Sequence, residues 1–172
     1  MDDWKRLIRD VPDFPKPGIL FRDITPLLGS PQALGEVVAA FAERYKSRGI
    51  TRIVAIESRG FIFGAPLALH MGVGFSPVRK PGKLPAKTVS VTYDLEYGEG
   101  TLQMHEDAVT KVDRVLVIDD LLATGGTAEA AARLVTTCGA SVAEFAFVIE
   151  LDFLKGRGRL DKVAPVHSLI RY

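Results

Sequence analysis

The sequence lacks a second cysteine. Cys138 is the one cysteine among 172 residues, so no disulfide can form within the chain, and we expect a protein of the reducing cytoplasm. Long apolar runs are also lacking, since no stretch approaches the roughly 20 residues that a membrane-spanning helix needs. The chain starts Met-Asp-Asp-Trp-Lys-Arg, without the apolar core of a signal peptide. We therefore expect no membrane association.

An excess of positive charge is missing as well. The chain has 22 lysine and arginine residues against 21 aspartate and glutamate residues, for a formal net charge of +1. Domains that bind nucleic acid usually carry a strong basic excess, so we expect no nucleic-acid partner. The three histidines, His70, His105 and His167, are far apart and show no metal-ligand spacing. With 47% hydrophobic and 25% charged residues, the composition is that of a globular protein.

Short apolar runs alternate with helix-like segments along most of the chain. We predict strands over residues 52–56, 73–78, 114–118, 142–149 and 166–170. We predict helices over residues 2–9, 31–49, 60–71 and 125–138. The helix at 60–71 is almost entirely apolar and should be buried. Strands that alternate with helices form a parallel sheet covered on both faces, so the sequence predicts a single α/β domain over residues 1–172.

Two segments depart from this alternation. Residues 88–93 and 101–104 alternate polar and apolar side chains around a glycine-containing tip, which predicts an antiparallel hairpin. Charges and glycines at the tip favour a mobile lid, although an ordinary surface loop would have the same composition. Residues 11–25 contain three prolines and a glycine, which exclude a long helix and predict an irregular arm.

Residues 115–127 carry the most informative motif. Four apolar residues are followed by Asp119 and Asp120, and a Thr-Gly-Gly-Thr turn then opens the next predicted helix. A glycine turn at a helix start aims backbone N–H groups at one point, where a phosphate can bind, and two carboxylates beside it suit the hydroxyls of a ribose. The residues expected to hold the phosphate are Ala123, Thr124, Gly125, Gly126 and Thr127.

Other interpretations of residues 115–127 fit less well. An ordinary β–α turn with a capped helix explains the glycines, but it does not explain an acid pair together with two threonines. A nucleotide-binding P-loop would continue with Gly-Lys-Ser or Gly-Lys-Thr, which is not found here. A dinucleotide site would show G-x-G-x-x-G at this strand, which is also not found.

Charged residues follow two other predicted strands, and ligands of open parallel sheets bind at such strand ends. Arg59 comes after the strand at 52–56. Its guanidinium can bind phosphate oxygens through two parallel hydrogen bonds, or it can cap the chain at the surface without a ligand. Arg79, Lys80 and Lys83 follow the strand at 73–78. These three cations form either a solvated face or a clamp for a pyrophosphate group.

Together the motifs resemble the type I phosphoribosyltransferases. Asp-Asp followed by Thr-Gly-Gly-Thr marks this family, and Phe-Arg-Asp-Ile at 21–24 with Leu-Glu-Tyr-Gly at 95–98 is similar to its adenine branch. Glu-Ser-Arg-Gly-Phe at 57–61 and Arg-Lys-Pro-Gly-Lys-Leu-Pro at 79–85 occur in the expected order between them. The resemblance covers about residues 10–172. It implies a twisted, mainly parallel sheet flanked by helices, a small N-terminal hood from about residues 10–30, and a flexible antiparallel hairpin.

The resemblance also implies a reaction. The chain would transfer the 5-phosphoribosyl group of 5-phosphoribosyl 1-pyrophosphate (phosphoribosyl pyrophosphate) to adenine, giving AMP and pyrophosphate in purine salvage. Mg²⁺ would take part, held mainly through substrate oxygens and not by a protein metal site. The family is usually homodimeric, and Arg79 would reach the partner's site. Two alternatives stay open: a phosphoribosyltransferase for another base such as xanthine, and a non-catalytic sensor of phosphoribosyl pyrophosphate.

On the adenine side, the resemblance assigns Phe21 and Arg22 to a hood over the base. Leu151 would pack on the other side of the base, although a core leucine is an equally good interpretation of that position.

On the catalytic side, the resemblance assigns Glu96, Tyr97 and Arg59. Glu96 would act as acid or base on the imidazole edge of adenine, and Tyr97 would approach the reacting centre as the hairpin closes. The resemblance further implies a cis peptide bond between Glu57 and Ser58.

Overall fold

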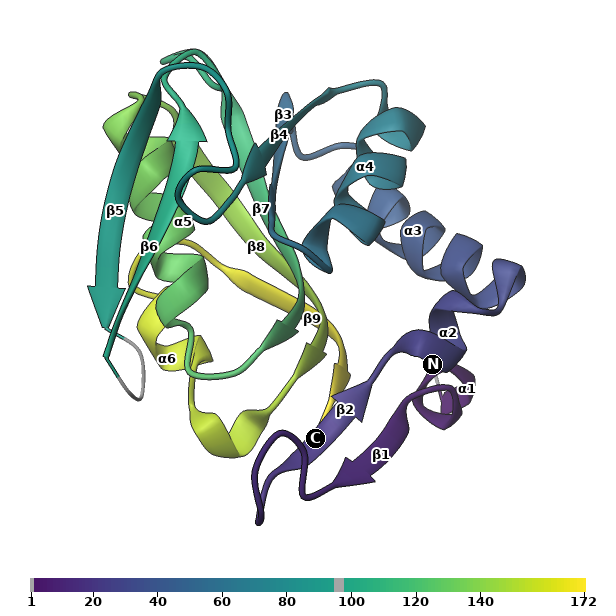
Figure 1. Cartoon of the computed structure of the whole chain (residues 1–172). Coiled ribbons are helices and arrows are strands. Elements are labelled where there is room, and N and C mark those ends of the chain that lie inside the picture. The colour runs from purple at the N-terminus through teal and green to yellow at the C-terminus, as the bar shows by residue number, and fades with distance from the viewer. Residues whose placement is uncertain (1, 95–97) are drawn as a thin grey trace.

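A five-stranded parallel sheet forms the centre of the protein, in a computed structural model that describes residues 2–94 and 98–172 (Figure 1). The strands lie in the order β4-β3-β7-β8-β9. Their bounds are Arg52–Ile56 for β3, Gly74–Val78 for β4, Arg114–Leu122 for β7, Ser141–Glu150 for β8 and Val166–Arg171 for β9. Every neighbouring pair is parallel, so the carboxyl ends of the strands meet at one edge of the sheet. The predicted α/β fold is confirmed.

Helices cover both faces of this sheet (Figure 1). The main helices are α3 (Pro31–Tyr45) and α4 (Gly60–Met71) on one face, and α5 (Gly126–Thr137) on the other face. The short elements are α1 (Asp2–Arg6), α2 (Thr25–Leu28), the 3-10 helix η1 (Asp152–Leu154) and α6 (Arg157–Leu160). α3 begins as predicted, because the Ser30 hydroxyl accepts a hydrogen bond from the Ala33 N–H at 3.2 Å.

The burial of α4 differs from the prediction. Phe63 and Leu67 are fully buried against the sheet, but Ile62 is 37% exposed and Leu69 is 85% exposed. The expectation of a wholly buried helix is therefore wrong for one side of α4. A helix that packs on one face of a sheet buries only the side that meets the sheet, and an apolar composition cannot change that geometry.

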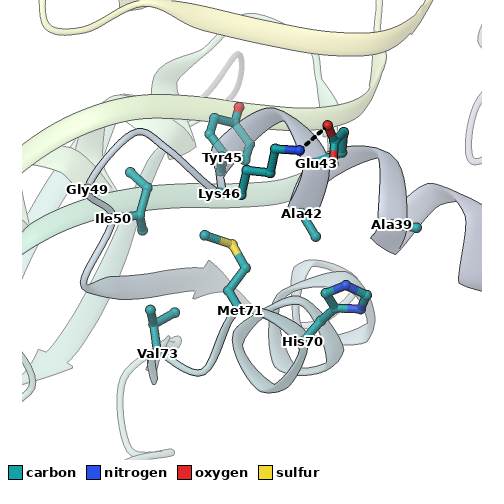
Figure 2. A pocket seen from close by; sticks show the side chains of 10 residues that line it. All are labelled: Ala39, Ala42, Glu43, Tyr45, Lys46, Gly49, Ile50, His70, Met71 and Val73. Atoms are coloured by element: carbon teal, nitrogen blue, oxygen red, sulfur yellow. Dashed lines mark hydrogen bonds and ion pairs between the residues drawn. The ribbon is translucent and has the colours of Figure 1, made fainter.

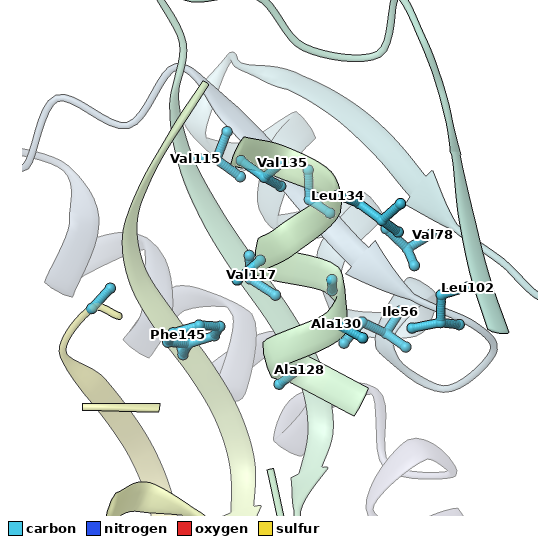
Figure 3. Packing of buried hydrophobic residues seen from close by; sticks show 14 of the residues in the cluster. Ile56, Val78, Leu102, Val115, Val117, Ala128, Ala130, Leu134, Val135 and Phe145 are labelled. Atoms are coloured by element: carbon cyan, nitrogen blue, oxygen red, sulfur yellow. The ribbon is translucent and has the colours of Figure 1, made fainter. Parts of the chain in front are cut away.

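The central strand β7 packs on both of its faces. Val115 and Val117 lie with Val135 of α5 and Phe145 of β8 in one hydrophobic cluster (Figure 3). The alternate residues of β7, such as Leu116, belong to the cluster that includes α3 and α4. An apolar run that is buried on both faces is typical of a central parallel strand, so the residues that follow it are held at the middle of the sheet edge.

Two antiparallel hairpins lie outside the central sheet (Figure 1). β5 (Thr88–Asp94) and β6 (Glu99–His105) form the predicted hairpin. β1 (Arg9–Pro12) and β2 (Leu20–Asp23) form a second one near the amino terminus. Among the described residues, none of the helices has both the length and the apolar character to cross a bilayer.

The β1–β2 hairpin corrects the prediction of an irregular arm. Pro12 lies at the end of the ladder opposite Leu20, where a missing N–H is tolerated. Pro15, Pro17 and Gly18 lie in the connection between the two strands. The prolines therefore form the turn of a hairpin, and they do not prevent pairing on either side of it.

Candidate active site

The acid pair lies within β7, which continues to Leu122 and does not end at residue 118 as predicted. Strand pairing places Asp119 beside Phe147 of β8. Asp120 is 3% exposed, whereas Asp119 is partly exposed. The Asp120 N–H donates to Asp119 Oδ1 at 2.8 Å, so the backbone of the strand orients the first carboxylate.

The Asp120 carboxylate is incompletely paired. Arg59 Nε lies 3.0 Å from Asp120 Oδ2 but out of line for a hydrogen bond, and this buried oxygen has no hydrogen-bond partner in the described part of the chain. Burial raises the pKa of Asp119, and the charge of Asp120 raises that pKa further. Burial also raises the pKa of Asp120, although the Arg59 guanidinium opposes this shift. Buried charge left this way is typical of a binding site.

The glycine turn after β7 opens α5 and shares a cavity with Asp119, whereas Asp120 is not in the lining of this cavity. Gly125 has φ +83°, a left-handed conformation that few other residues adopt. The cavity of about 90 Å³ is lined by Asp119, Leu121, Leu122, Ala123, Thr124, Gly125, Thr127, Ala128 and Phe147. Of the predicted phosphate residues, Gly126 is not in this lining but forms the first residue of α5. The first N–H groups of a helix have no partners within it, so this end of α5 favours an anion.

Arg59 connects the acid pair with the hood. Besides its ion pair with Asp120, its guanidinium lies 5.3 Å from the centre of the Phe21 ring. The side chain is 37% exposed, so it keeps access to solvent. The peptide bond between Glu57 and Ser58 is cis, which confirms the expectation from the resemblance.

The cationic segment after β4 is anchored by Glu57. Arg79 Nη2 donates to Glu57 Oε1 at 3.0 Å, and the Lys80 N–H donates to Glu57 Oε2 at 2.9 Å. These two hydrogen bonds, the one from Arg79 above all, lower the pKa of Glu57. Arg79 also donates to the Lys83 carbonyl at 3.0 Å. The Lys80 and Lys83 residues are exposed, so they supply charge at the surface, whereas Arg79 is engaged within the loop.

The hood is tied to the end of the sheet through Arg22. Its guanidinium forms an ion pair with Asp10 and lies 3.7 Å from the centre of the Tyr172 ring. The Arg22 side chain is only 15% exposed as a result. Leu151 is partly buried against the cluster that includes α3 and α4, and its N–H donates to the Leu122 carbonyl at 2.9 Å.

Comparison with known proteins decides the family. The family model described as "Phosphoribosyl transferase domain" matches residues 24–170. An adenine phosphoribosyltransferase from Synechococcus sp. is 58% identical to this chain, over 99% of each sequence. The chain belongs to the adenine phosphoribosyltransferase family.

Solved structures agree with this assignment. An adenine phosphoribosyltransferase from Thermoanaerobacter pseudethanolicus superposes with a TM-score of 0.96 at 50% identity, covering 99% of both chains. The adenine phosphoribosyltransferase of Saccharomyces cerevisiae, in complex with adenine and an imino-altritol bisphosphate, gives a TM-score of 0.92 at 43% identity, covering 98% of this chain and 97% of that one. The fold is therefore the type I phosphoribosyltransferase fold.

Two contacts at the site escaped the sequence analysis. Glu57 anchors the cationic segment, and its place directly after a strand was an available signal. Tyr93 of β5 accepts a long hydrogen bond of 3.4 Å from the Thr127 hydroxyl, which links the hairpin to the turn at residues 123–127. Nothing in the local sequence indicated that contact. The predicted catalytic residues Glu96 and Tyr97 lie outside the described residues.

A separate groove of about 560 Å³ lies between α3 and α4 (Figure 2), and neither residue of the acid pair lines it. It is larger than the cavity beside residues 123–127, but its lining includes none of the predicted site residues. Its charged groups, Glu43 and Lys46, already form an ion pair with each other. Size alone therefore does not mark this groove as the active site.

Proposed function

We propose that the chain transfers the 5-phosphoribosyl group from phosphoribosyl pyrophosphate to adenine, giving AMP and pyrophosphate as in purine salvage. The observation that carries this proposal is the acid pair, Asp119 and Asp120, beside a glycine turn at a helix start, with one buried oxygen of Asp120 left without a hydrogen-bond partner in the described residues. Membership of the adenine phosphoribosyltransferase family supports it, and so does the adenine in the complex of the yeast relative.

The phosphoribosyl half of the substrate would bind along the carboxyl edge of β7. Asp119 and Asp120 accept hydrogen bonds from the ribose hydroxyls. The 5-phosphate is held by the turn of Ala123, Thr124, Gly125, Gly126 and Thr127. The leaving pyrophosphate is balanced by the cations Arg59, Lys80 and Lys83. Because all of these groups are held by strand ends and helix starts, positioning and charge stabilisation supply most of the catalysis.

The adenine would lie between the hood and Leu151. We propose that main-chain groups at Phe21 and Arg22 read the base edge, a carbonyl accepting from the 6-amino group and an N–H donating to N1. This suits the geometry, since the Arg22 side chain is engaged with Asp10 and Tyr172. Guanine and hypoxanthine present the opposite pattern, and each buried group left unpaired costs about 1–3 kcal/mol.

The transfer itself exchanges one bond at the anomeric carbon for another. The purine nitrogen attacks this carbon as pyrophosphate departs, with inversion, through a transition state that resembles an oxocarbenium ion. Glu96 exchanges a proton with the imidazole edge of adenine, and Tyr97 lies near the reacting centre when the hairpin closes. Closure excludes water, which would otherwise capture the carbocation-like centre.

Mg²⁺ fits the acid pair on the chemistry of its donors. Carboxylate oxygens are the ligands that Mg²⁺ prefers, and the buried Asp120 Oδ2 has no hydrogen-bond partner in the ranges 2–94 and 98–172. We propose that the ion is held mainly through substrate oxygens, with Asp119 and Asp120 nearby. When bound, it neutralises charge on the pyrophosphate.

We further propose that the chain works as a cytoplasmic homodimer. The exposed apolar side of α4, with Ile62 and Leu69, supports association with a second copy, and the single cysteine suits a reducing compartment. Arg79 would then reach the partner's site. Sedimentation of the wild type and of Leu69→Glu tests this proposal. We expect the wild type to be a dimer and the variant to dissociate. A variant that stays dimeric would exclude this side of α4 as the interface.

The decisive experiment measures pyrophosphate release from phosphoribosyl pyrophosphate and Mg²⁺ with adenine, hypoxanthine, guanine and xanthine in turn. We expect kcat/KM for adenine to exceed that for the oxo-purines by about 30-fold to 10⁴-fold. The reason is that an oxo-purine with the opposite hydrogen-bond pattern leaves two groups of the site mismatched. Ratios near one would remove the adenine assignment and leave the phosphoribosyl chemistry intact. Binding of phosphoribosyl pyrophosphate without turnover of any base would indicate the sensor instead.

A further inference from the structure

The segment that follows β8 packs its backbone directly on the phosphate turn. We define residues 151–160 as the brace segment and residues 123–127 as the phosphate turn. We propose that Gly156 in the brace segment, fixed by the ion pair of Glu150 and Arg157, positions the phosphate turn for the 5-phosphate of the substrate. The inference rests on the proposed function, and it adds a positioning role that none of the phosphate-turn residues supplies by itself.

The contact is between two backbones. A methyl group built on Gly156 would lie 2.1 Å from the Ala123 carbonyl oxygen and 3.0 Å from the Gly125 nitrogen. From the other side, a methyl group on Gly125 would lie 2.9 Å from the Gly156 carbonyl oxygen. Such distances are far below van der Waals contact, so neither position can carry a side chain unless the backbones separate.

Local conformation does not explain the glycine at 156. Gly156 has φ −61° and ψ −32°, ordinary helical values that any residue adopts. Gly125, by contrast, needs glycine for its φ of +83° alone. Close approach to Ala123 is therefore the physical reason for glycine at 156, and this ties the two segments together.

The brace segment is attached firmly on its other sides. Glu150 is 2% exposed, and its carboxylate accepts from Arg157 Nε at 2.9 Å and from Arg157 Nη2 at 2.5 Å. Arg157 Nη1 also donates to the Val166 carbonyl of β9 at 2.7 Å. Leu160 is fully buried, so the far end of the segment is held in the core. The brace segment thus transmits the position of the sheet to the phosphate turn.

A second attachment joins the brace segment to α5. Arg159 Nε lies 3.2 Å from Glu129 Oε2 in the first turn of that helix. The turn between β7 and α5 is therefore contacted at its middle by Gly156 and at its helical end by Arg159. A shift of the brace segment would move the N–H groups that converge on the phosphate, and a misplacement of about 1 Å can lower a rate about 100-fold.

The test compares Gly156→Ala with Gly158→Ala. Neither glycine has a positive φ, and a methyl group on Gly158 would meet nothing within 4 Å, so Gly158→Ala is the matched control. We expect Gly156→Ala to raise KM for phosphoribosyl pyrophosphate by about 10-fold to 100-fold, with KM for adenine within about two-fold of wild type. The control should keep both constants.

Calorimetric titration with ribose 5-phosphate provides a readout that does not need turnover. We expect its affinity to fall in Gly156→Ala and to stay at the wild-type value in Gly158→Ala. Equal losses for adenine and phosphoribosyl pyrophosphate, or unchanged affinity for the phosphate ligand, would overturn the inference. A wild type that binds ribose 5-phosphate but makes no AMP would instead count against the proposed function, and the titration would still decide the role of Gly156.

If Gly156→Ala does not fold, Arg157→Lys decides. Lysine keeps the charge beside Glu150 but loses the fork of two hydrogen bonds. We expect a rise of several-fold, about 3-fold to 10-fold, in KM for phosphoribosyl pyrophosphate and little change for adenine. Wild-type constants in a folded Arg157→Lys would show that the brace segment does not position the turn.

Discussion

Buried carboxylates at the two ends of the sheet differ in how they are paired. At the carboxyl edge, Asp120 keeps a buried oxygen without a hydrogen-bond partner among the described residues. Near the amino end of β8, Glu144 is 2% exposed yet accepts from Arg44 Nε at 3.0 Å and from Arg48 Nη1 at 2.9 Å. Arginines of the same chain therefore satisfy Glu144, whereas one oxygen of Asp120 remains available to a ligand.

The pKa values separate the acid pair from a paired acid at the same edge of the sheet, Glu150 at the end of β8. Burial raises the pKa of Asp119, and nothing nearby reverses that shift. Burial acts in the same direction on Glu150, but hydrogen bonds led by Arg157 outweigh it, and the pKa of Glu150 is lowered. Burial by itself therefore does not identify a functional acid in this fold. A buried carboxylate oxygen that lacks a hydrogen-bond partner is the better indicator.

The largest effect on stability is expected from Glu144→Ala. Removing the carboxylate leaves Arg44 and Arg48 facing each other, and breaking a buried pair of this kind costs about 3–5 kcal/mol. Because both arginines can turn partly to water, we expect the lower end, about 3 kcal/mol in the free energy of unfolding. Urea unfolding measures it, and kcat/KM of the folded variant should match wild type. A loss of activity without a loss of stability would break the comparison.

Arg59→Ala should lower activity and leave stability nearly unchanged, which is the opposite of Glu144→Ala. The side chain is 37% exposed, so little packing is lost, but a charge on the pyrophosphate side disappears. We expect kcat/KM to fall because the transition state loses about 2–4 kcal/mol of stabilisation. The free energy of unfolding should change little. Steady-state kinetics beside urea unfolding provide both numbers. Normal turnover would remove Arg59 from the mechanism.

Asp119→Asn tests the acid pair with a minimal change, because it replaces one carboxylate oxygen by an amide nitrogen. Losing a charged acceptor for ribose hydroxyls should weaken phosphoribosyl pyrophosphate binding by about 1.5–3 kcal/mol and affect adenine less. Since the folded pKa of Asp119 is raised, ionisation of this group opposes folding at neutral pH. The variant should therefore be as stable as wild type at pH 7 or more stable, and wild type should gain relative to it as pH falls. Equal weakening of both substrates would indicate a structural role.

Local sequence indicated the acid pair of the candidate site and missed the buried pairing of Glu144 for a physical reason. Asp119, Asp120 and the phosphate turn are contiguous, so their geometry follows from one strand, one turn and one helix start. Glu144 meets Arg44 across a separation of 100 residues, and no local pattern carries that contact. Gly156 meets Ala123 in the same non-local way. The β1–β2 hairpin was missed because proline content indicates where pairing stops but not what pairs on either side.

The smallest effect is expected in the hood, where Asp23 is a paired acid near the surface. Its pKa is lowered from 3.8 to about 2, first by the Thr25 N–H and then by Arg9. An acid with a lowered folded pKa contributes stability above its unfolded pKa, and that contribution is lost as pH falls from about 4 to 2. After allowance for solvent screening we expect about 1 kcal/mol. Urea unfolding of wild type and Asp23→Asn between pH 5 and pH 2.5 measures it, and parallel curves would contradict it.

β7 lies between β3 and β8 and has an apolar cluster on each face, so its amide protons should exchange slowly with solvent. The amide protons of Leu116, Val117 and Ile118 should exchange with deuterium only when the whole domain opens, whereas those of the hood exchange through local fraying. The phosphate turn follows directly after β7, the strand that we expect to be the most protected. Molecules that have transiently lost the hood would thus still hold a phosphoribosyl ligand, and the base could enter or leave without releasing it.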